Sequence, residues 1–356
     1  MKLRGALSSI QGRFETEARE AFDDGWTNRD ENADSPPAAL ETTVTEERAR
    51  SIIARNDSPD VPFEQSINPY RGCEHGCIYC FSRPSHAYLE LSPGLDFESK
   101  LFAKVNAPEL LKEELSRRGY VVKPIAFGTN TDCYQPIERR YRIMRQILEL
   151  LADCSHPLSI VTKSALIERD LDLLGPMAAK NLVKALVSIN TLDRGIARRL
   201  EPRAASPQRR LDTLRALASA GVPCGVMVAP VIPALTDKSI EEVIEAASGA
   251  GATAAGYILM RLPHEVKPLF KEWLAEHYPQ RADHVMSIVR QVRGGRENDP
   301  NFGTRMTGTG TYAELIASRF EIACRRCGLN KERRGEQPLD CSLFRPPSVA
   351  GQMNLF

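Results

Sequence analysis

Short apolar segments alternate with longer amphipathic segments along the middle of the chain. Continuous apolar runs are typical of strands buried in a sheet, whereas apolar residues that recur at helical spacing indicate helices packed on a core. The runs predict strands at Ser66–Tyr70, Lys123–Phe127, Leu158–Thr162, Lys184–Ile189, Gly225–Ala229 and Ala255–Met260. The amphipathic segments predict helices at Ala107–Arg118, Ile137–Leu151, Ile167–Ala179, Pro207–Ala220, Ile240–Ser248 and Val266–His277.

The order of these segments predicts the fold class. A strand followed by a helix, repeated along the chain, argues for a parallel sheet with helices outside it. We therefore expect an α/β fold with a central domain at residues 58–280. The pattern does not say whether the sheet is open or curled.

Two regions of different composition flank this domain. We expect an N-terminal arm at residues 1–57, in which Gly12–Thr43 is rich in Glu, Asp, Asn and Pro and is predicted to be poorly ordered. The segment Thr45–Asn56 shows weak helical spacing. Residues 281–356 are predicted to form a helical C-terminal extension, with helices around Ala282–Val292 and Thr311–Arg325, that ends in a tail.

The composition narrows the class of protein. The chain has 356 residues, 42% of them hydrophobic and 26% charged, so a sizeable core can form. No apolar run approaches the length of a membrane span, so no membrane association is expected. No long apolar segment follows the first residues, and nine cysteines without a signal peptide predict a reducing, cytoplasmic location. The net charge of +1 neither favours nor excludes nucleic acid as a partner.

Three cysteines follow the first predicted strand within eight residues. Cys73, Cys77 and Cys80 have the spacing C-x3-C-x2-C, which brings three soft sulfur ligands together. Such a set suits an iron–sulfur cluster or zinc. A closed structural zinc site needs a fourth ligand, and His75 lies too close in sequence to supply it comfortably. Disulfides are disfavoured by the odd number, and the spacing therefore favours the cluster.

With these cysteines the chain resembles the radical S-adenosylmethionine (radical SAM) superfamily, and the stretch Asn68–Cys73 is similar to its spore photoproduct lyase-like branch. The resemblance, over about residues 58–277, implies a partial (β/α)6 TIM-like barrel. It implies a [4Fe–4S] cluster on Cys73, Cys77 and Cys80 as the catalytic centre, with S-adenosylmethionine on the open iron. An electron donor such as flavodoxin or ferredoxin would then drive cleavage to a 5′-deoxyadenosyl radical that abstracts hydrogen from a substrate.

The loops after the next strands carry candidate cofactor contacts. In parallel α/β barrels chemistry lies at the carboxyl ends of the strands. Asp132 follows the second strand, and Lys163 follows the third directly. The resemblance implies that the Thr131-Asp132 pair meets the methionine amine, that Lys163 meets the carboxylate or a ribose or phosphate oxygen, and that Tyr79 also contacts the cofactor. For each of these loops a plain turn, or for Lys163 a solvated strand end, is the alternative.

The fourth strand and its loop add three more candidates. Ser188 and Asn190 alternate on one strand face, and the resemblance implies that they contact the ribose or methionine. Arginines crowd the segment from Arg194 to Arg210, and such clusters suit phosphate or carboxylate groups. We expect an ordinary charged helix surface for all of them except Arg203, which we place near the cofactor.

The resemblance leaves the substrate open. Spore photoproduct lyase has a reactive cysteine three residues before the Asp of the second-strand loop, whereas this chain has Thr129 there. Cys133 lies on the other side of Asp132 and cannot be assumed to replace it. Thymine-dimer cleavage is therefore not expected, and another nucleic-acid substrate, as in DNA repair, or a small molecule remains open.

Two further features have a functional and a structural interpretation. Cys324, Cys327 and Cys341 could hold a second metal, but they lack a fourth ligand, and we favour structural roles for them. The tail Gln352–Phe356 resembles peptides that dock onto the bacterial sliding clamp, with a tail packed on its own domain as the alternative. The rival interpretation of the whole chain is a non-catalytic iron–sulfur or zinc accessory protein in DNA repair.

Overall fold

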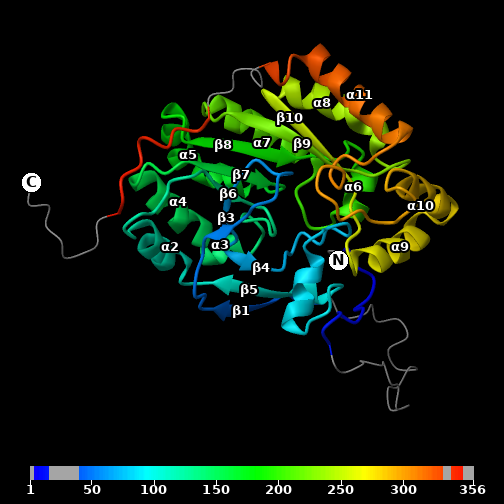
Figure 1. Cartoon of the computed structure of the whole chain (residues 1–356), viewed down its shortest axis with the longest axis horizontal. Helices are drawn as coiled ribbons and strands as arrows, with labels where there is room; N and C mark the ends of the chain where they lie inside the picture. Colours follow the sequence, from blue (N-terminus) through cyan, green and yellow to red (C-terminus); the bar gives the residue numbers. More distant parts are fainter. Residues whose placement is uncertain (1–3, 16–39, 332–337, 348–356) are drawn as a thin grey trace, which may run out of the picture.

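A computed structural model describes residues 4–15, 40–331 and 338–347 (Figure 1). Its centre is a seven-stranded sheet in the order β10-β9-β8-β7-β6-β3-β2. All neighbouring pairs are parallel except β2 with β3, which is antiparallel at the sheet edge. The strands are β2 (Ala54–Arg55), β3 (Gln65–Ile67), β6 (Ile125–Phe127), β7 (Leu158–Thr162), β8 (Val183–Ser188), β9 (Cys224–Val231) and β10 (Ala254–Leu259).

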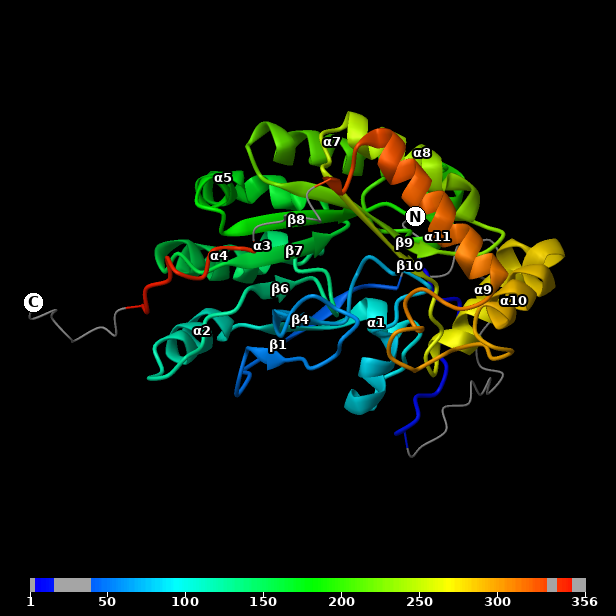
Figure 2. The same cartoon turned by 45° about the horizontal axis from the view of Figure 1, so that its top comes forward.

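The helices that connect the strands along the chain pack against the central sheet (Figure 2). The α-helices are α1 (Asp96–Ser99), α2 (Ala107–Leu115), α3 (Glu138–Tyr141), α4 (Ile143–Asp153), α5 (Leu171–Ala179), α6 (Arg194–Leu200), α7 (Pro207–Ser219), α8 (Ile240–Gly249), α9 (Val266–His277), α10 (Ala282–Gln291) and α11 (Thr311–Cys327). Short 3-10 helices are η1 (Arg83–Leu89), η2 (Ala165–Asp170), η3 (Asp237–Ser239) and η4 (Pro279–Arg281). No helix among the described residues is long and apolar enough to cross a membrane.

The α/β class, the parallel sheet and its strand–helix units confirm the prediction from the sequence. Five of the six predicted strands each form one strand: Leu158–Thr162 has the predicted bounds, and ends of the other four are shifted by one or two residues. The predicted strand Ser66–Tyr70 is divided between β3 and β4 (Tyr70–Arg71), whereas α9 has the predicted bounds. The sheet does not close on itself, because β10 and β2 are its two edges. The structure therefore does not confirm the predicted partial barrel, and the barrel stays a prediction. The proposed domain boundaries stay predictions as well.

Two local predictions were wrong. The weak helical spacing at Thr45–Asn56 does not form a helix, because β1 (Thr43–Glu47) and β2 occupy the segment. In β1 the chain pairs in parallel with β5 (Lys100–Lys104), and β5 pairs with β4 (Tyr70–Arg71) in a second, three-stranded sheet. Strand pairing over long sequence distances outweighed a weak local pattern. The second error is α6, which forms where the loop after the fourth predicted strand was expected.

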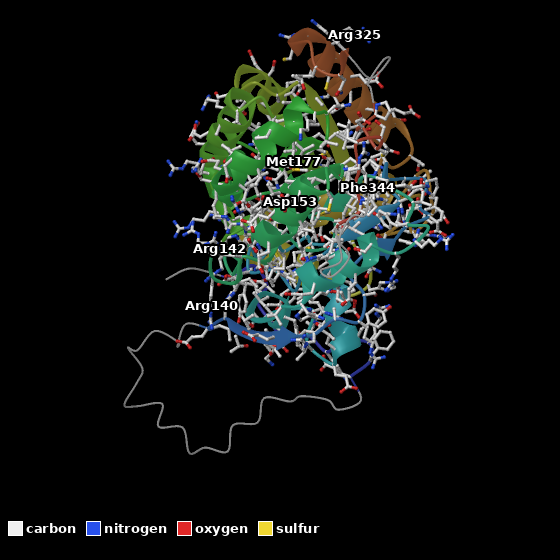
Figure 3. The ribbon with its side chains drawn as sticks, turned by 90° about the vertical axis from the view of Figure 1, so that its left-hand side faces the viewer. Arg140, Arg142, Asp153, Met177, Arg325 and Phe344 are labelled. Atoms are coloured by element: carbon white, nitrogen blue, oxygen red, sulfur yellow. The ribbon has the colours of Figure 1, made fainter. Side chains whose placement is uncertain are left out.

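One predicted helix is divided. The segment Ile137–Leu151 forms α3 and α4, which are separated by Arg142 with a φ of 52°. A non-glycine residue in this left-handed region cannot continue a right-handed helix. Arg142 lies at the surface, where its side chain meets solvent (Figure 3). The break turns the chain after the β6 loop, so that α3 and α4 are separate segments.

Two apolar cores position the functional loops. The larger core lies between the central sheet and its helices and includes Phe127, Ile160 and Val226. The smaller core joins α9 and α10 to the cysteine loop and includes Ile78 and Trp273, which are both fully buried. The cysteine loop therefore rests on packed apolar side chains.

Candidate functional site

The cysteine loop begins directly after β4. Cys73 and Cys77 are each 7% exposed, and Cys80 is half-buried. Gly72 and Gly76 have φ values of 71° and 68°, which other residues rarely adopt. At Gly76 a Cβ would also lie 2.6 Å from a carboxylate oxygen of Glu98. The two glycines thus allow the tight turns that bring three cysteines into one loop.

Buried contacts hold this loop in place. Arg83 donates from Nε to the Cys77 carbonyl at 2.9 Å, and it forms an ion pair with Glu98 in which both side chains are fully buried. The Glu98 carboxylate also accepts the backbone N–H groups of Gly5 and Ala6 at 2.8 Å each. On the opposite side, the N–H of Ile78 donates to the Leu200 carbonyl at 3.1 Å. The backbone of the loop is therefore fixed from two directions.

The three thiols influence one another electrostatically. Burial raises the pKa of the Cys73 thiol well above its usual range, and nearby Cys77 and Cys80 raise it further. Burial raises the pKa of Cys77 to about 12, although Lys163 opposes this shift. Thiolates are the form that binds metal. Bare thiolates are thus costly here, and iron would supply the positive charge that stabilises them.

The donor set fits a cluster better than a single ion. In the part of the chain that the structure describes, no three His, Cys, Asp or Glu side chains are grouped closely enough to hold one metal ion. Ligands of one zinc ion must all lie within bonding distance of the same point. Cysteine ligands of a cubane bind different irons, so they are spaced more widely. Cys73 and Cys77 are buried and Cys80 is half-buried in one loop without such a close group, which fits the second arrangement.

Asp132 braces the loop after β6 against its neighbours. Its Oδ1 accepts from the Tyr134 N–H at 2.9 Å and from the Thr162 hydroxyl at 2.7 Å. Its Oδ2 accepts from the Lys163 N–H at 2.8 Å and lies 3.4 Å from Nδ1 of His75. Most of the acceptor capacity of this carboxylate is already used by the protein. Its contact with the methionine amine stays a prediction.

Lys163 has an ammonium group that is not paired. Its Nζ lies 5.9 Å from the ring centre of Tyr79 and makes no hydrogen bond or ion pair with any described residue. Burial lowers the pKa of Lys163, but Cys77 and Glu201 together raise it above its ordinary value. The group is therefore cationic at neutral pH and available to an anionic ligand.

A buried network around Glu201 joins three of the predicted contacts. Glu201 accepts hydrogen bonds from the hydroxyl of Tyr79 and from Nδ2 of Asn190, the latter at 3.3 Å, and it pairs with Arg210. Arg210 also donates to the Ser188 carbonyl at 2.9 Å. Burial raises the pKa of Glu201, but Arg210 and Lys163 lower it below its usual value. Oδ1 of Asn190 is buried and has no partner among the described residues.

Thr131 and Arg203 make mainly structural contacts. The Thr131 hydroxyl donates to the Tyr70 carbonyl at 3.1 Å, and Arg203 pairs with Glu74 in the cysteine loop. The N–H of Arg203 also donates to the His75 carbonyl at 3.2 Å, whereas its Nε is buried without a partner. Tyr79, Lys163, Ser188 and Asn190 thus gather beside the cysteines, while Thr131, Asp132 and Arg203 brace the loop.

Sequence reasoning missed the charged residues that support this site, chiefly Arg83, Glu98, Glu201 and Arg210. Each is buried, although isolated charged residues in loops and helices are usually solvated. Glu201 was visible only as part of a Glu-Pro-Arg loop, and Arg210 as one arginine of a crowded segment. Their pairing depends on contacts that no local pattern reveals.

The remaining cysteines lie elsewhere. Cys133 is fully buried in the larger core, so it is not available to replace a reactive thiol at Thr129. Cys324 is buried on α11, and the half-buried Cys341 lies in the segment that runs past Asn181 and Cys154. These cysteines form no metal-binding group within the described residues. The predicted clamp-binding tail, Gln352–Phe356, lies outside the described residues.

Comparisons with known proteins identify the family. The family model described as the Radical SAM superfamily matches residues 67–247. An uncharacterised protein of Mycobacterium tuberculosis is 38% identical over 233 residues, which cover 65% of this chain and 68% of the relative. An uncharacterised protein of Methanocaldococcus jannaschii is 28% identical over 215 residues, which cover 60% of this chain and 76% of that protein.

Solved structures show a similar fold. Spore photoproduct lyase complexed with dinucleoside spore photoproduct has a TM-score of 0.58, with 17% identity and 80% of each chain covered. A mutant of that lyase with bound S-adenosylmethionine and dinucleoside spore photoproduct has a TM-score of 0.57, again with 80% of each chain covered. At this identity the likeness concerns the fold. The matched family model spans the cysteine loop and the loops after β6, β7 and β8, and this chain therefore belongs to the radical SAM superfamily, a family of enzymes that use a [4Fe–4S] cluster and S-adenosylmethionine.

Proposed function

We propose that Cys73, Cys77 and Cys80 hold the [4Fe–4S] cluster of this enzyme and that its substrate is a nucleic acid. When bound there, the cluster and S-adenosylmethionine would supply radical chemistry for hydrogen abstraction from the substrate. The observation that carries the proposal is the unpaired ammonium of Lys163 beside Cys77 and Tyr79. A half-buried cation without a partner among the described residues favours an anion beside it, and the methionine carboxylate is one.

The protein's own groups orient the cofactor. Lys163 would bind the carboxylate by charge, while the unpaired Oδ1 of Asn190 would accept a hydrogen bond from an amine or hydroxyl. Glu201 fixes the Asn190 amide and the Tyr79 hydroxyl, so both are held before the ligand arrives. The loops around the site are held in place by the hydrogen bonds of Asp132 and Thr131 and by the ion pair of Arg203. The apolar core behind Ile78 excludes water from one side of the site.

A reactive radical site also needs an electron and a substrate. Radical SAM enzymes require an electron donor, and we propose a flavodoxin or ferredoxin for this role. For the substrate, support comes from two exposed phenylalanines, Phe302 and Phe81, of which Phe81 directly follows Cys80. The guanidinium of Arg261 lies 5.7 Å from the Phe81 ring centre, and that of Arg305 lies 4.5 Å from the Phe302 ring centre.

The two pairs influence each other electrostatically. Burial lowers the pKa of Arg261, and the charge of Arg305, which itself pairs with Asp60, lowers it further. Phe81 and Phe302 are 47% and 57% exposed. Aromatic rings next to arginines stack bases and neutralise phosphates in single-stranded nucleic acid. Thymine-dimer cleavage is not part of the proposal, because Thr129 stands at the reactive cysteine position and Cys133 is buried in the core.

The test begins with anaerobic reconstitution of the full chain and measurement of iron, sulfide and 5′-deoxyadenosine after reduction with dithionite. Replacing Cys73, Cys77 and Cys80 with Ala should abolish both the cluster and 5′-deoxyadenosine. Cys154→Ala is the matched control, since that buried cysteine lies on another element. Iron retained by the triple variant would refute the ligand assignment. Phe81→Ala should weaken binding of single-stranded DNA several-fold. Unchanged binding would refute the proposal that the substrate is a nucleic acid.

A further inference from the structure

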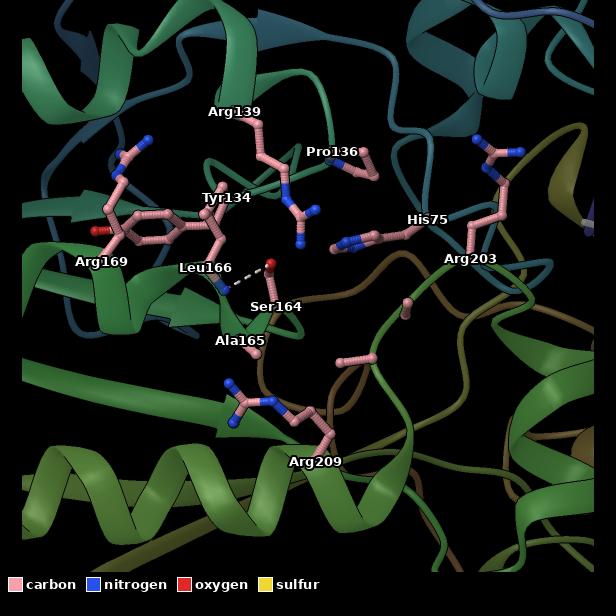
Figure 4. A pocket seen from close by; sticks show the side chains of 12 residues that line it. His75, Tyr134, Pro136, Arg139, Ser164, Ala165, Leu166, Arg169, Arg203 and Arg209 are labelled. Atoms are coloured by element: carbon pink, nitrogen blue, oxygen red, sulfur yellow. Dashed lines mark hydrogen bonds between the residues drawn. The ribbon is translucent and has the colours of Figure 1, made fainter.

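A cavity of about 410 Å³ opens beside the cysteine loop (Figure 4). Its walls come from the loops after β6, β7 and β8 together with His75, which lies two residues from both Cys73 and Cys77. Four arginines line it, and no acidic residue does: Arg139, Arg169, Arg203 and Arg209. The cavity therefore presents donors and positive charge next to the proposed reaction site.

The four arginines differ in how far their charge is already neutralised. Arg209 forms two hydrogen bonds of 2.6 Å with Glu168, and Arg169 pairs with Glu138 and Asp170. These two mainly shape the wall. They contribute little net charge because each already faces a carboxylate.

Arg203 and Arg139 retain capacity for a ligand. Arg203 pairs with Glu74 but keeps Nε buried without a partner. The Arg139 guanidinium makes no hydrogen bond or ion pair with any described residue. In Figure 4 its side chain reaches into the space between Ser164 and His75. The Ser164 hydroxyl oxygen accepts from the Leu166 N–H at 3.2 Å, so its own proton is free to be donated.

We propose that this cavity binds a phosphate group of the substrate, an inference that rests on the proposed function and specifies its substrate as phosphate-bearing. Guanidinium groups bind phosphate oxygens with paired hydrogen bonds and retain their charge at any physiological pH. The volume exceeds that of one phosphate and falls in the range of small-molecule sites. A phosphate held by Arg139, with Ser164 and His75 beside it, anchors the rest of the substrate against the cysteine loop.

The same phosphate chemistry can come from a mononucleotide or from a nucleic-acid backbone. Binding of dTMP, of a short single-stranded deoxythymidine oligonucleotide and of its uncharged methylphosphonate analogue to the reconstituted enzyme separates these sources. Preference for the oligonucleotide assigns a backbone phosphate, and preference for dTMP assigns a phosphomonoester. Either result supports the phosphate site if the methylphosphonate analogue binds at least about tenfold more weakly than the oligonucleotide.

The matched variants are Arg139→Gln and Arg140→Gln. Both arginines are exposed on α3, but Arg140 does not line the cavity and instead lies over the Tyr141 ring. Arg139→Gln should weaken binding of the preferred phosphate ligand at least about tenfold, since a charged hydrogen bond is lost. Arg140→Gln should leave it unchanged. Equal effects of the two variants, or binding of neither ligand at millimolar concentration, would overturn the inference.

Two further measurements separate this inference from the proposed function. If S-adenosylmethionine competes with the phosphate ligand, the cavity belongs to the cofactor and the phosphate assignment is wrong. Iron content and 5′-deoxyadenosine formation are measured on the same samples. If iron and 5′-deoxyadenosine are found but no phosphate ligand binds, only the role of the cavity is refuted. If the phosphate ligand binds and its binding depends on Arg139, but iron and 5′-deoxyadenosine are absent, only the proposed function is refuted.

Discussion

Oδ2 of Asp132 lies 3.4 Å from Nδ1 of His75, so the loop after β6 is joined directly to the cysteine loop. The same carboxylate also holds the end of β7 through Thr162 and the N–H of Lys163. One side chain therefore sets the relative position of the proposed cluster ligands and of the lysine expected to bind the cofactor.

Asp132→Ala should lower both the iron content and the affinity for S-adenosylmethionine, because the loops that it joins lose a shared acceptor. Lys163→Ala should weaken cofactor binding by about tenfold or more while leaving the iron in place, because a charged contact alone is lost. Electron paramagnetic resonance of the reduced cluster, titrated with cofactor, measures both effects. Unchanged affinity in both variants would remove the two residues from the cofactor site.

Arg210→Leu should lower the free energy of unfolding by about 3–5 kcal/mol, because it leaves the buried carboxylate of Glu201 without its partner. Arg215→Leu is the control on the same helix, since Arg215 and Asp212 form an exposed ion pair. That variant should cost less than about 1 kcal/mol. Denaturant unfolding followed by circular dichroism compares the two, and similar losses would show that the Glu201 network contributes nothing special to stability.

Replacing Cys324 with Ala and Cys327 with Ser should leave the iron and zinc content of the protein unchanged. The reason is that Cys324 lies in the apolar core and Cys327 packs against that core. Elemental analysis of the parent and the double variant measures the outcome. A metal lost on this change would identify a second site on α11.

Stability should fall as the pH decreases from about 6.5 towards 4. Burial lowers the pKa of His156 to about 4, and it lowers the pKa of His86 to a similar value. In this interval the unfolded chain binds protons that the folded chain does not, so protonation favours unfolding. Each histidine should contribute about 3 kcal/mol to the loss. Above about pH 6.5 neither histidine should make the free energy of unfolding depend on pH.

The variant His156→Gln should show a smaller loss of stability over the same pH interval, as measured by denaturant unfolding at each pH. His284→Gln is the control, because His284 is exposed on α10. The interpretation fails if the parent and His156→Gln have the same pH dependence.

The sequence by itself determined most of the helices and strands and the spacing of the three cysteines. Apolar periodicity is a local property, so strands such as Leu158–Thr162 and helices such as Val266–His277 were predicted with their observed bounds. The spacing of Cys73, Cys77 and Cys80 is also local, and it sufficed to identify the family to which the matched segment belongs.

Only the tertiary structure decided how charges far apart in the chain are paired. Glu201 and Arg210 look like solvated residues in sequence, but folding buries both and aims them at Tyr79 and Ser188. The pairing of β1 with β5 joins segments more than fifty residues apart, which outweighed the weak helical spacing near Thr45. Periodicity reports which face of an element is buried, whereas the partner that meets this face is chosen by packing across the whole fold.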